Sequence, residues 1–367
     1  MRRRTRGITG LLAAVLLGAC GTTADTGTAA SIGSATPAPA GTPGTTPVAA
    51  NAADVSPAPA SAAPATAGPA EAATSGTATA PLTVPVTTVD DANGLPRVVV
   101  EISVGGGAPV PVILDTGSSG LMIDASVLGS DVDTSGAVPF TKNYVSSSIQ
   151  GSVVQAPVSI GGVSTPAIGV VAYQSSQGAN DQLTGGIAKG LIGIASEGQT
   201  GTAAPVWSPS LQLPAPYDTM STLEVATSDA GTWTLGPVPS AADAVTVALT
   251  AVTGAPDNAG RWGKDMNLCW TFAGGSPACG ATDLDTGAQD LLVNSDVAGV
   301  SPAAGQAVTV AASQGGTPLW TTTTGQALTG VHQASLGTTQ FNTGLSFFFD
   351  HLVTFDYGQG RVLLSPR

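Results

Sequence analysis

The stretch PVPVILDTGSSGLMI, residues 109–123, decides how this chain folds. Its first half is apolar and rich in β-branched residues, which predicts a buried strand over Val110–Leu114. That strand runs into Asp115, and a carboxylate is costly to bury unless other groups stabilise it. The residues that follow are small and can hydrogen-bond to a carboxylate: Thr116, Gly117 and Ser118. The pattern indicates a carboxylate that is held at a strand end for chemistry.

A weaker copy of this stretch lies 170 residues further along the chain. Asp285-Thr286-Gly287-Ala288 follows a strand-like or hairpin segment and precedes an apolar run, as the first copy does. The tripeptide alone means little, because Asp25-Thr26-Gly27 also occurs in a segment without apolar strands. With the flanking context, the repeat predicts two lobes that each contribute one such loop.

From about Pro81 onward, short β-type runs are separated by Gly, Pro, Asn and Asp, which predicts a mainly β protein. Helical periodicity is confined to a turn or two at Asp124–Leu128 and Ser346–His351. The expected strands are Arg97–Val104, Val110–Leu114, Ser152–Ile160, Ala167–Tyr173, Leu191–Ile194, Thr232–Leu235, Val245–Leu249 and Leu352–Asp356.

The N-terminal segment predicts export. Residues 1–20 place four arginines before an apolar run too short to span a membrane, as in a secretory signal peptide. Their end, Leu17-Gly18-Ala19-Cys20, resembles a bacterial lipobox, in which the cysteine is acylated and begins the mature protein. Ordinary cleavage nearby, with Cys20 discarded, is the alternative. We expect lipidation of Cys20, because a cysteine at this point has no other visible purpose.

Residues 21–80 consist almost entirely of Ala, Thr, Pro, Gly and Ser. Such a segment buries too little apolar surface to offset its loss of conformational entropy, which predicts a disordered stalk.

The whole chain has a net charge of −13, with 11 basic and 24 acidic residues. Loss of the four arginines with the signal peptide would bring it to −17. Nucleic acid is therefore not an expected partner, since phosphate binding needs clustered cations.

Two cysteines remain besides Cys20. In an exported chain, Cys269 and Cys279 are first interpreted as a disulfide across a short hairpin, with a metal site as the less favoured alternative. Neither histidine, His332 or His351, accompanies a Cys-x-x-Cys motif. With only two histidines as candidate bases, the chain offers little support for a serine or cysteine catalytic triad. We expect no metal, no cofactor and no catalytic role for either histidine.

At the two Asp-Thr-Gly loops the sequence resembles the pepsin-like aspartic proteases, and the likeness extends over residues 90–367. YVSSSIQGSVVQAPVSIGG (144–162) resembles the flap hairpin of that family, with Gly151 seven residues after Tyr144. GLIGI (190–194) resembles the strand beside the first catalytic loop, and residues 343–367 resemble the closing segment. The Ala/Gly-rich composition and the stalk are similar to the bacterial branch, including the mycobacterial PE-type surface aspartic proteases.

The resemblance implies a bilobal fold with the active site between two β lobes, at 81–205 and 206–367. It implies an aspartic endopeptidase with Asp115 and Asp285 as the catalytic pair, in which a water is activated between the two carboxyl groups. Thr116, Gly117, Ser118, Thr286 and Gly287 would support the pair, and Tyr144 would close the flap over an extended polypeptide. We expect a monomer, lipid-anchored at the outer face of a bacterial membrane or cell surface.

Three departures from the family pattern stand out. Ala288 leaves Asp285 without the hydroxyl partner of many relatives, although retroviral aspartic proteases also have Asp-Thr-Gly-Ala. Met122 stands where relatives have a tryptophan that supports the flap tyrosine. Asp283 replaces an aliphatic residue, and it would be costly to bury without a partner. The alternative is therefore a catalytically inactive pepsin-like module that binds peptides or proteins.

Overall fold

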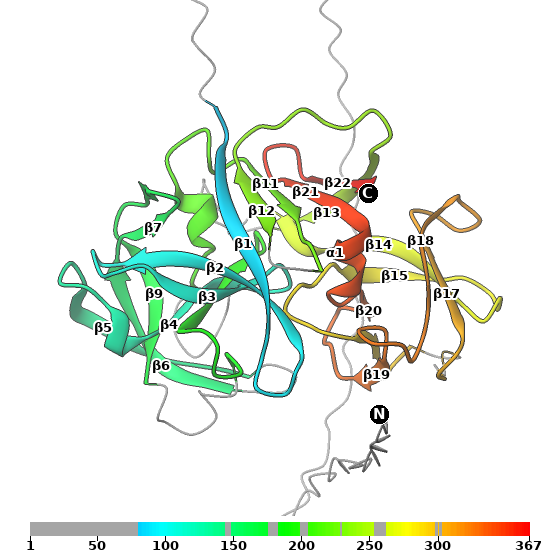
Figure 1. The fold of residues 1–367 in the computed structure, drawn as a ribbon, viewed down its shortest axis with the longest axis horizontal. Coiled ribbons are helices and arrows are strands. Elements are labelled where there is room, and N and C mark those ends of the chain that lie inside the picture. The colour runs from blue at the N-terminus through cyan, green and yellow to red at the C-terminus, as the bar shows by residue number, and fades with distance from the viewer. Residues whose placement is uncertain are drawn as a thin grey trace, which may run out of the picture. The chain divides into compact units, whose positions relative to one another are not determined.

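The computed structural model describes residues 80–143, 148–174, 183–198, 205–227, 230–252, 262–297, 300 and 303–367 (Figure 1). The expected signal peptide, Cys20 and almost all of the stalk lie outside the described residues. All described residues belong to one compact unit, Thr74–Arg367. Within them, no helix is long and apolar enough to cross a membrane.

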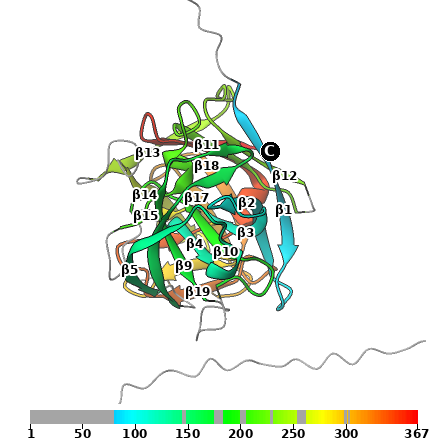
Figure 2. The same cartoon turned by 90° about the vertical axis from the view of Figure 1, so that its left-hand side faces the viewer.

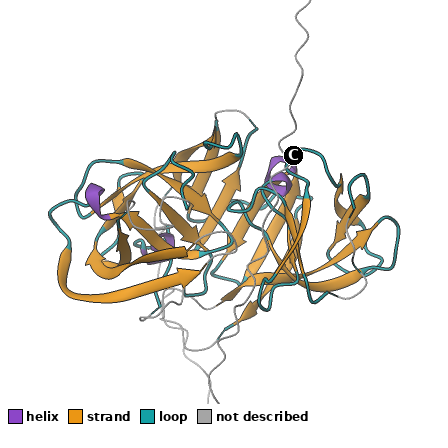
Figure 3. Ribbon diagram, turned by 90° about the horizontal axis from the view of Figure 1, so that it is seen from below, coloured by secondary structure: helices purple, strands orange, loops and turns teal. Residues whose placement is uncertain are grey.

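The regular elements of the described chain are almost all strands, as the sequence predicts (Figure 3). Each expected strand has a counterpart, although the run predicted at Ser152–Ile160 is two strands that break at Pro157. The two expected helical segments form as η1 (Ala125–Val127) and α1 (Ser346–Asp350), and η3 (Pro209–Gln212) was not expected.

In the first lobe, three strands place the quoted stretch. β3 (Val110–Asp115) and β4 (Ser119–Asp124) carry it, and β10 (Gly190–Ile194) is parallel to β3 and antiparallel to β4. Gly193 of β10 lies against Ser118 and Ser119 so closely that a side chain there would collide with their backbone. The other strands of this lobe are β2 (Pro96–Val104), β5 (Asp133–Asn143), β6 (Ser148–Ala156), β7 (Val158–Ile160), β8 (Val163–Ser164) and β9 (Ile168–Tyr173).

The second lobe repeats this arrangement around the second loop. β15 (Ala278–Asp283) is parallel to β20 (Phe341–Asn342), which in turn is antiparallel to β16 (Leu291–Asn294). The triple β15, β16 and β20 therefore matches β3, β4 and β10. The remaining strands of this lobe are β14 (Trp262–Phe272), β17 (Ala307–Ala311), β18 (Pro318–Thr323) and β19 (Val331–Ala334).

A run of antiparallel strands connects the two lobes (Figures 1 and 2). β1 pairs with β2 on one side and β12 on the other, and the run continues through β11, β21 and β22 to β13. The bounds are β1 (Leu82–Asp90), β11 (Met220–Glu224), β12 (Gly231–Leu235), β13 (Val245–Ala251), β21 (His351–Asp356) and β22 (Arg361–Pro366). Trp233, Leu223 and Val353 of this run are fully buried, so the joint between the lobes belongs to the hydrophobic core.

The expected disulfide is confirmed. Cys269 of β14 and Cys279 of β15 lie directly opposite each other in the antiparallel pair, and their sulfur atoms are bonded. The bridge fixes the register of the hairpin whose second strand leads to Asp285.

Candidate functional site

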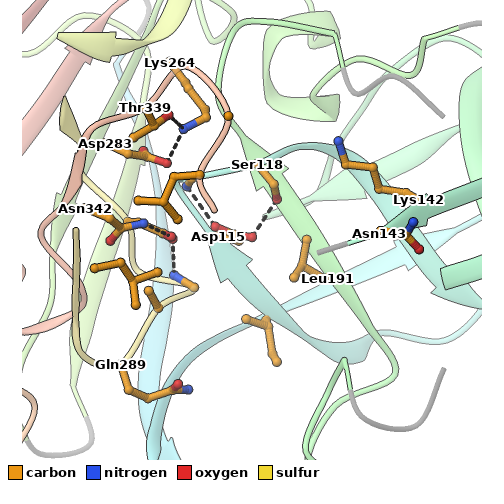
Figure 4. Close-up of a pocket in the computed structure, with 18 of the residues that line it drawn as sticks. Asp115, Ser118, Lys142, Asn143, Leu191, Lys264, Asp283, Gln289, Thr339 and Asn342 are labelled. Carbon is orange, nitrogen blue, oxygen red and sulfur yellow. Dashed lines mark hydrogen bonds and ion pairs between the residues drawn. The ribbon is translucent and has the colours of Figure 1, made fainter. Parts of the chain in front are cut away.

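The two Asp-Thr-Gly loops meet in a cleft with a volume of about 760 Å³. Asp115 ends β3, and Asp285 follows β15 by two residues. Both carboxyl groups line the cleft, together with residues from each lobe, including Ile113, Leu191, Lys264 and Asp283 (Figure 4). The structure thus brings together the two aspartates that the sequence repeat singled out.

The two threonines bind each other's loops reciprocally. The Thr286 backbone N–H donates to Thr116 Oγ1 at 2.9 Å, and the Thr116 N–H donates to Thr286 Oγ1 at 3.1 Å. Each hydroxyl also donates across the interface, Thr116 to Leu284 O at 2.5 Å and Thr286 to Leu114 O at 2.6 Å. These bonds are buried, so they fix the loops relative to each other in an environment where an unmade bond is costly.

The two glycines allow the carboxyl groups to approach. Gly117 N–H donates to Asp115 Oδ1 at 2.8 Å, and Gly287 N–H donates to Asp285 Oδ1 at 2.7 Å. A side chain on Gly117 would collide with the Asp285 carboxyl group, and one on Gly287 would collide with that of Asp115. Glycine is needed here for lack of space, and neither position has a positive φ angle.

The outer oxygens of the two carboxyl groups have different partners. Ser118 Oγ donates to Asp115 Oδ2 at 2.6 Å, as the resemblance implied. Ala288 offers no such bond, but Asn342 Nδ2 donates to Asp285 Oδ2 at 2.7 Å (Figure 4). Asp285 thus lacks the hydroxyl partner of many relatives, as expected, and an amide from β20, which the sequence did not indicate, donates to its outer oxygen instead. Gly344 N–H donates to Asn342 Oδ1 at 2.8 Å, which orients the amide.

The surroundings of Asp115 favour its protonated form. Burial raises the pKa of Asp115 to about 8, and the neighbouring charge of Asp285 adds to the rise, whereas the Ser118 hydrogen bond opposes it. Asp115 is only 6% exposed, while Asp285 is half-buried. Two carboxyl groups in hydrogen-bond contact in such an environment hold one proton between them up to neutral pH.

Asp283 is buried, and it has a partner that no local pattern of the sequence indicated. Lys264 Nζ lies 2.5 Å from Asp283 Oδ2, 2.9 Å from Asp265 Oδ1 and 3.1 Å from Thr339 Oγ1. Burial alone would lower the pKa of Lys264, but the two carboxylates raise it above its usual value. Lys264 therefore keeps its charge. Burial raises the pKa of Asp283 well above its usual range, and the Lys264 ammonium group opposes that rise.

A second cation reaches the site from β2. Arg97 Nη1 donates to Gly287 O at 2.8 Å, and its Nε contacts the buried Asp91 carboxylate at 3.4 Å. Arg97 could not be singled out from the sequence, because nothing local predicts that the start of β2 meets a loop 190 residues away.

The flap hairpin forms, with β5 and β6 antiparallel and Phe140 opposite Gly151. Tyr144 lies outside the described residues, so its role stays a prediction. Lys142 and Asn143, at the end of β5, line the cleft. Met122 is fully buried within a hydrophobic cluster of the first lobe.

Neither histidine contacts the aspartate pair. His351 is buried, with its two ring nitrogens 3.0 Å from Phe347 O and Leu319 O. His332 lies at the cleft wall, 3.0 Å from Asp290 Oδ2. Across the described parts of the chain, no group of three or more His, Cys, Asp or Glu side chains could hold a metal ion.

Comparisons with known proteins agree with this geometry. The family model described as PE-PGRS C-terminal aspartyl peptidase-like domain matches residues 82–362. Among solved structures, the chain is similar to the aspartic proteinase from Irpex lacteus, with a TM-score of 0.57 and 17% sequence identity. This similarity covers 78% of this chain and 97% of that one, and at this identity it concerns the fold alone. No curated protein sequence matches. The expected pepsin-like family and the bilobal, mainly β fold are confirmed.

The raised pKa of Asp115 predicts how stability depends on pH. The folded protein retains a proton that the unfolded chain releases, so this group lowers stability as pH rises from about 4 to about 8. Asp115→Asn removes that loss, and each unit of the pKa shift is worth about 1.4 kcal/mol. We therefore expect the melting temperature of Asp115→Asn minus that of the wild type to increase by at least several degrees between pH 4 and pH 8.

The control is Asp243→Asn, at an exposed position. Its melting curve should follow that of the wild type across the same pH range. If the melting temperatures of Asp115→Asn and the wild type depended on pH in the same way, the pKa of Asp115 would not be raised in the folded protein.

Proposed function

This chain belongs to the PE-PGRS C-terminal aspartyl peptidase-like domain family, and from that membership and the cleft geometry we propose that it is an aspartic endopeptidase. The single observation that carries the proposal is the pair of carboxyl groups, Asp115 and Asp285, locked face to face by the reciprocal threonine bonds. Its substrate is an extended polypeptide, which fits an open cleft lined by both lobes.

The two carboxyl groups have complementary tasks. Asp115 holds the shared proton, because it is the more buried member and its pKa is raised. Asp285 is the ionised member, since the Asn342 amide donates to its outer oxygen and stabilises the charge. A water between them loses a proton to Asp285 as its oxygen attacks the scissile carbonyl carbon, while Asp115 donates its proton to the carbonyl oxygen.

Collapse of the tetrahedral intermediate restores the enzyme. Asp285 passes its proton to the leaving amide nitrogen, the C–N bond breaks, and Asp115 regains a proton from the intermediate's hydroxyl group. No covalent intermediate forms in this scheme. General acid–base catalysis of this kind contributes about 10²–10⁴-fold to the rate.

The proposed setting is extracellular. The lipobox-like residues 17–20 support export with a lipid anchor on Cys20, and the polar stalk over 21–80 would carry the folded part away from the membrane. Substrates would then be polypeptides at or beyond the cell surface, and the protein would act as a monomer.

The second candidate function is an inactive peptide-binding module, and the observation in its favour is Ala288. The Asn342 amide reduces the weight of that departure, because it supplies the missing hydrogen bond to Asp285. The two functions differ in outcome, since a binding module would hold peptides in the cleft and release them intact.

Cleavage of a diverse peptide pool, followed by mass spectrometry from pH 3 to pH 9, tests the main proposal. We expect the wild type to cleave, and Asp115→Asn and Asp285→Asn each to lose at least about 10³-fold in kcat, because each removes one of the proton-transfer groups.

Activity should fall as pH rises through about 8, where Asp115 loses its proton. The Ser118 hydrogen bond lowers the pKa of Asp115, so its loss in Ser118→Ala should raise that pKa and move the fall in activity to higher pH.

Folding of each variant is checked by circular dichroism. Wild-type activity that persists in both asparagine variants would exclude the two-aspartate mechanism. Peptides that bind to the folded wild type but stay intact at every pH would favour the binding module.

The role of Asn342 can be tested by removing its hydrogen bond to Asp285 and supplying a new donor from position 288. Asn342→Leu should lower kcat about 10- to 100-fold, because a hydrogen bond to a charged group is worth about 1.5–3 kcal/mol. Adding Ala288→Ser to that variant should recover part of the loss, since the new hydroxyl group would have the same relation to Asp285 that Ser118 has to Asp115. Ala288→Ser alone is the control and should stay within about threefold of wild type. Unchanged kcat in Asn342→Leu would remove Asn342 from the site.

A further inference from the structure

The strand residues that precede the two aspartates differ sharply in character. Ile113 lies two residues before Asp115 and pairs with Leu191 of β10. Asp283 lies two residues before Asp285 and pairs with Asn342 of β20. All four side chains line the cleft, at equivalent places in the two lobes. The cleft therefore has one apolar wall and one charged wall.

The apolar wall lies beside Asp115. Ile113, Leu191 and Leu183 are each less than a tenth exposed, and they belong to one hydrophobic cluster of the first lobe. Their cleft-facing atoms offer no hydrogen-bonding group to a ligand. A large apolar side chain would bury its surface here at a gain of about 25 cal/mol per Å².

The charged wall lies on the other side of Asp115, where Lys264 and Asp283 face each other (Figure 4). Lys264 has three ammonium protons and three acceptors around it, on Asp283, Asp265 and Thr339, so none is left for a ligand. Asp283 Oδ1 is buried and has no hydrogen-bond partner among the described residues. The wall thus has one unmet acceptor, on Asp283, and its one cation has no unmet donor.

The net charge of this wall is negative. Glu197 also lines the cleft, and its Oε2 accepts the Lys264 backbone N–H at 3.3 Å. One ammonium group therefore stands among three carboxyl groups, those of Asp283, Asp265 and Glu197. The sum stays negative even when Asp283 carries a proton, because two carboxylates still exceed one ammonium.

We propose that Asp283, Lys264 and Glu197 form a specificity-determining subsite for a lysine or arginine side chain next to the scissile bond. Neighbouring side chains of an extended peptide point in opposite directions, so the residue on the other side of that bond meets the apolar wall. The enzyme then cleaves between a large apolar residue and a basic residue. This inference rests on the proposed peptidase function and specifies its substrate class.

The test is the cleavage-site profile of the full chain on a diverse peptide pool at low ionic strength. We expect lysine and arginine to be enriched about fivefold at one position flanking the cut, and large apolar residues at the other, because one partly exposed charge pair gives a discrimination of about this size. The basic preference should weaken in about 0.5 M salt, because partly exposed charges are screened. Enrichment of aspartate or glutamate at that position would overturn the proposal.

Two variants assign the preference to these residues. Asp283→Ile with Lys264→Leu gives the charged wall the apolar character of Ile113, and apolar residues should then replace basic ones at that position. Glu197→Gln removes one charge at the half-buried edge of the wall. It should reduce the enrichment of basic residues about twofold or more relative to apolar residues at the same position. A basic preference unchanged in both variants would contradict the proposal.

A binding measurement separates this inference from the proposed function. Two peptides carry a hydroxyethylene unit in place of the scissile bond and differ only in lysine or leucine at the flanking position. The lysine peptide should bind the wild type about fivefold more tightly, and Glu197→Gln should reduce that ratio. If the wild type cleaves nothing, the proposed function fails, and this ratio still tests the subsite. Equal affinities would overturn the subsite and leave the peptidase proposal standing.

Discussion

The reciprocal hydrogen bonds between Thr116 and Thr286 are the constraint on which the site depends. Each threonine satisfies a backbone N–H of the other loop and donates to a carbonyl oxygen on the opposite lobe. The four bonds are buried, so neither loop can shift without leaving polar groups unpaired, at a cost of about 1–3 kcal/mol each. The strands that connect the lobes hold them near each other, but the threonines set the distance between the carboxyl groups.

The two halves of the site are equivalent in backbone and unequal in side chains. The triples β3, β4, β10 and β15, β16, β20 have the same pairing pattern, which places each aspartate at the same point of its lobe. Beside Asp115 the first lobe presents the apolar side chains of Ile113 and Leu191, and its hydrogen-bond donors there are Ser118 Oγ and Gly117 N–H. Around Asp285 the neighbours are polar, with the Asn342 amide and the Lys264–Asp283 pair. In the mechanism that we propose, this inequality separates the tasks of two chemically identical groups.

Local patterns were sufficient for much of this fold. A β-branched run that ends in Asp-Thr-Gly-Ser predicted β3 and its loop, and the resemblance of residues 144–162 to the family's flap predicted the flap hairpin. The partners of Asp285 and Asp283 could not be found in this way. Asn342 belongs to a strand of only two residues, which has no periodicity. That strand pairs in parallel with β15, and the Asn342 amide then reaches Asp285, 57 positions away in the sequence. The contact between Lys264 and Asp283 was easier to predict. The disulfide fixes the register of β14 and β15, and in that register the start of β14 lies opposite the end of β15.

The central claim is that Asp115 and Asp285 form one proton-sharing pair, and titration of their side-chain carboxyl carbons by ¹³C NMR tests it most directly. Signals are assigned with Asp115→Asn and Asp285→Asn, and the wild type is followed from pH 2 to pH 9. The account predicts that the pair loses its protons in two well-separated steps, the second near pH 8, and that either substitution changes the titration of the remaining aspartate. Two independent titrations near the usual pKa of about 3.9 for an aspartate, each unaffected by the other substitution, would contradict it.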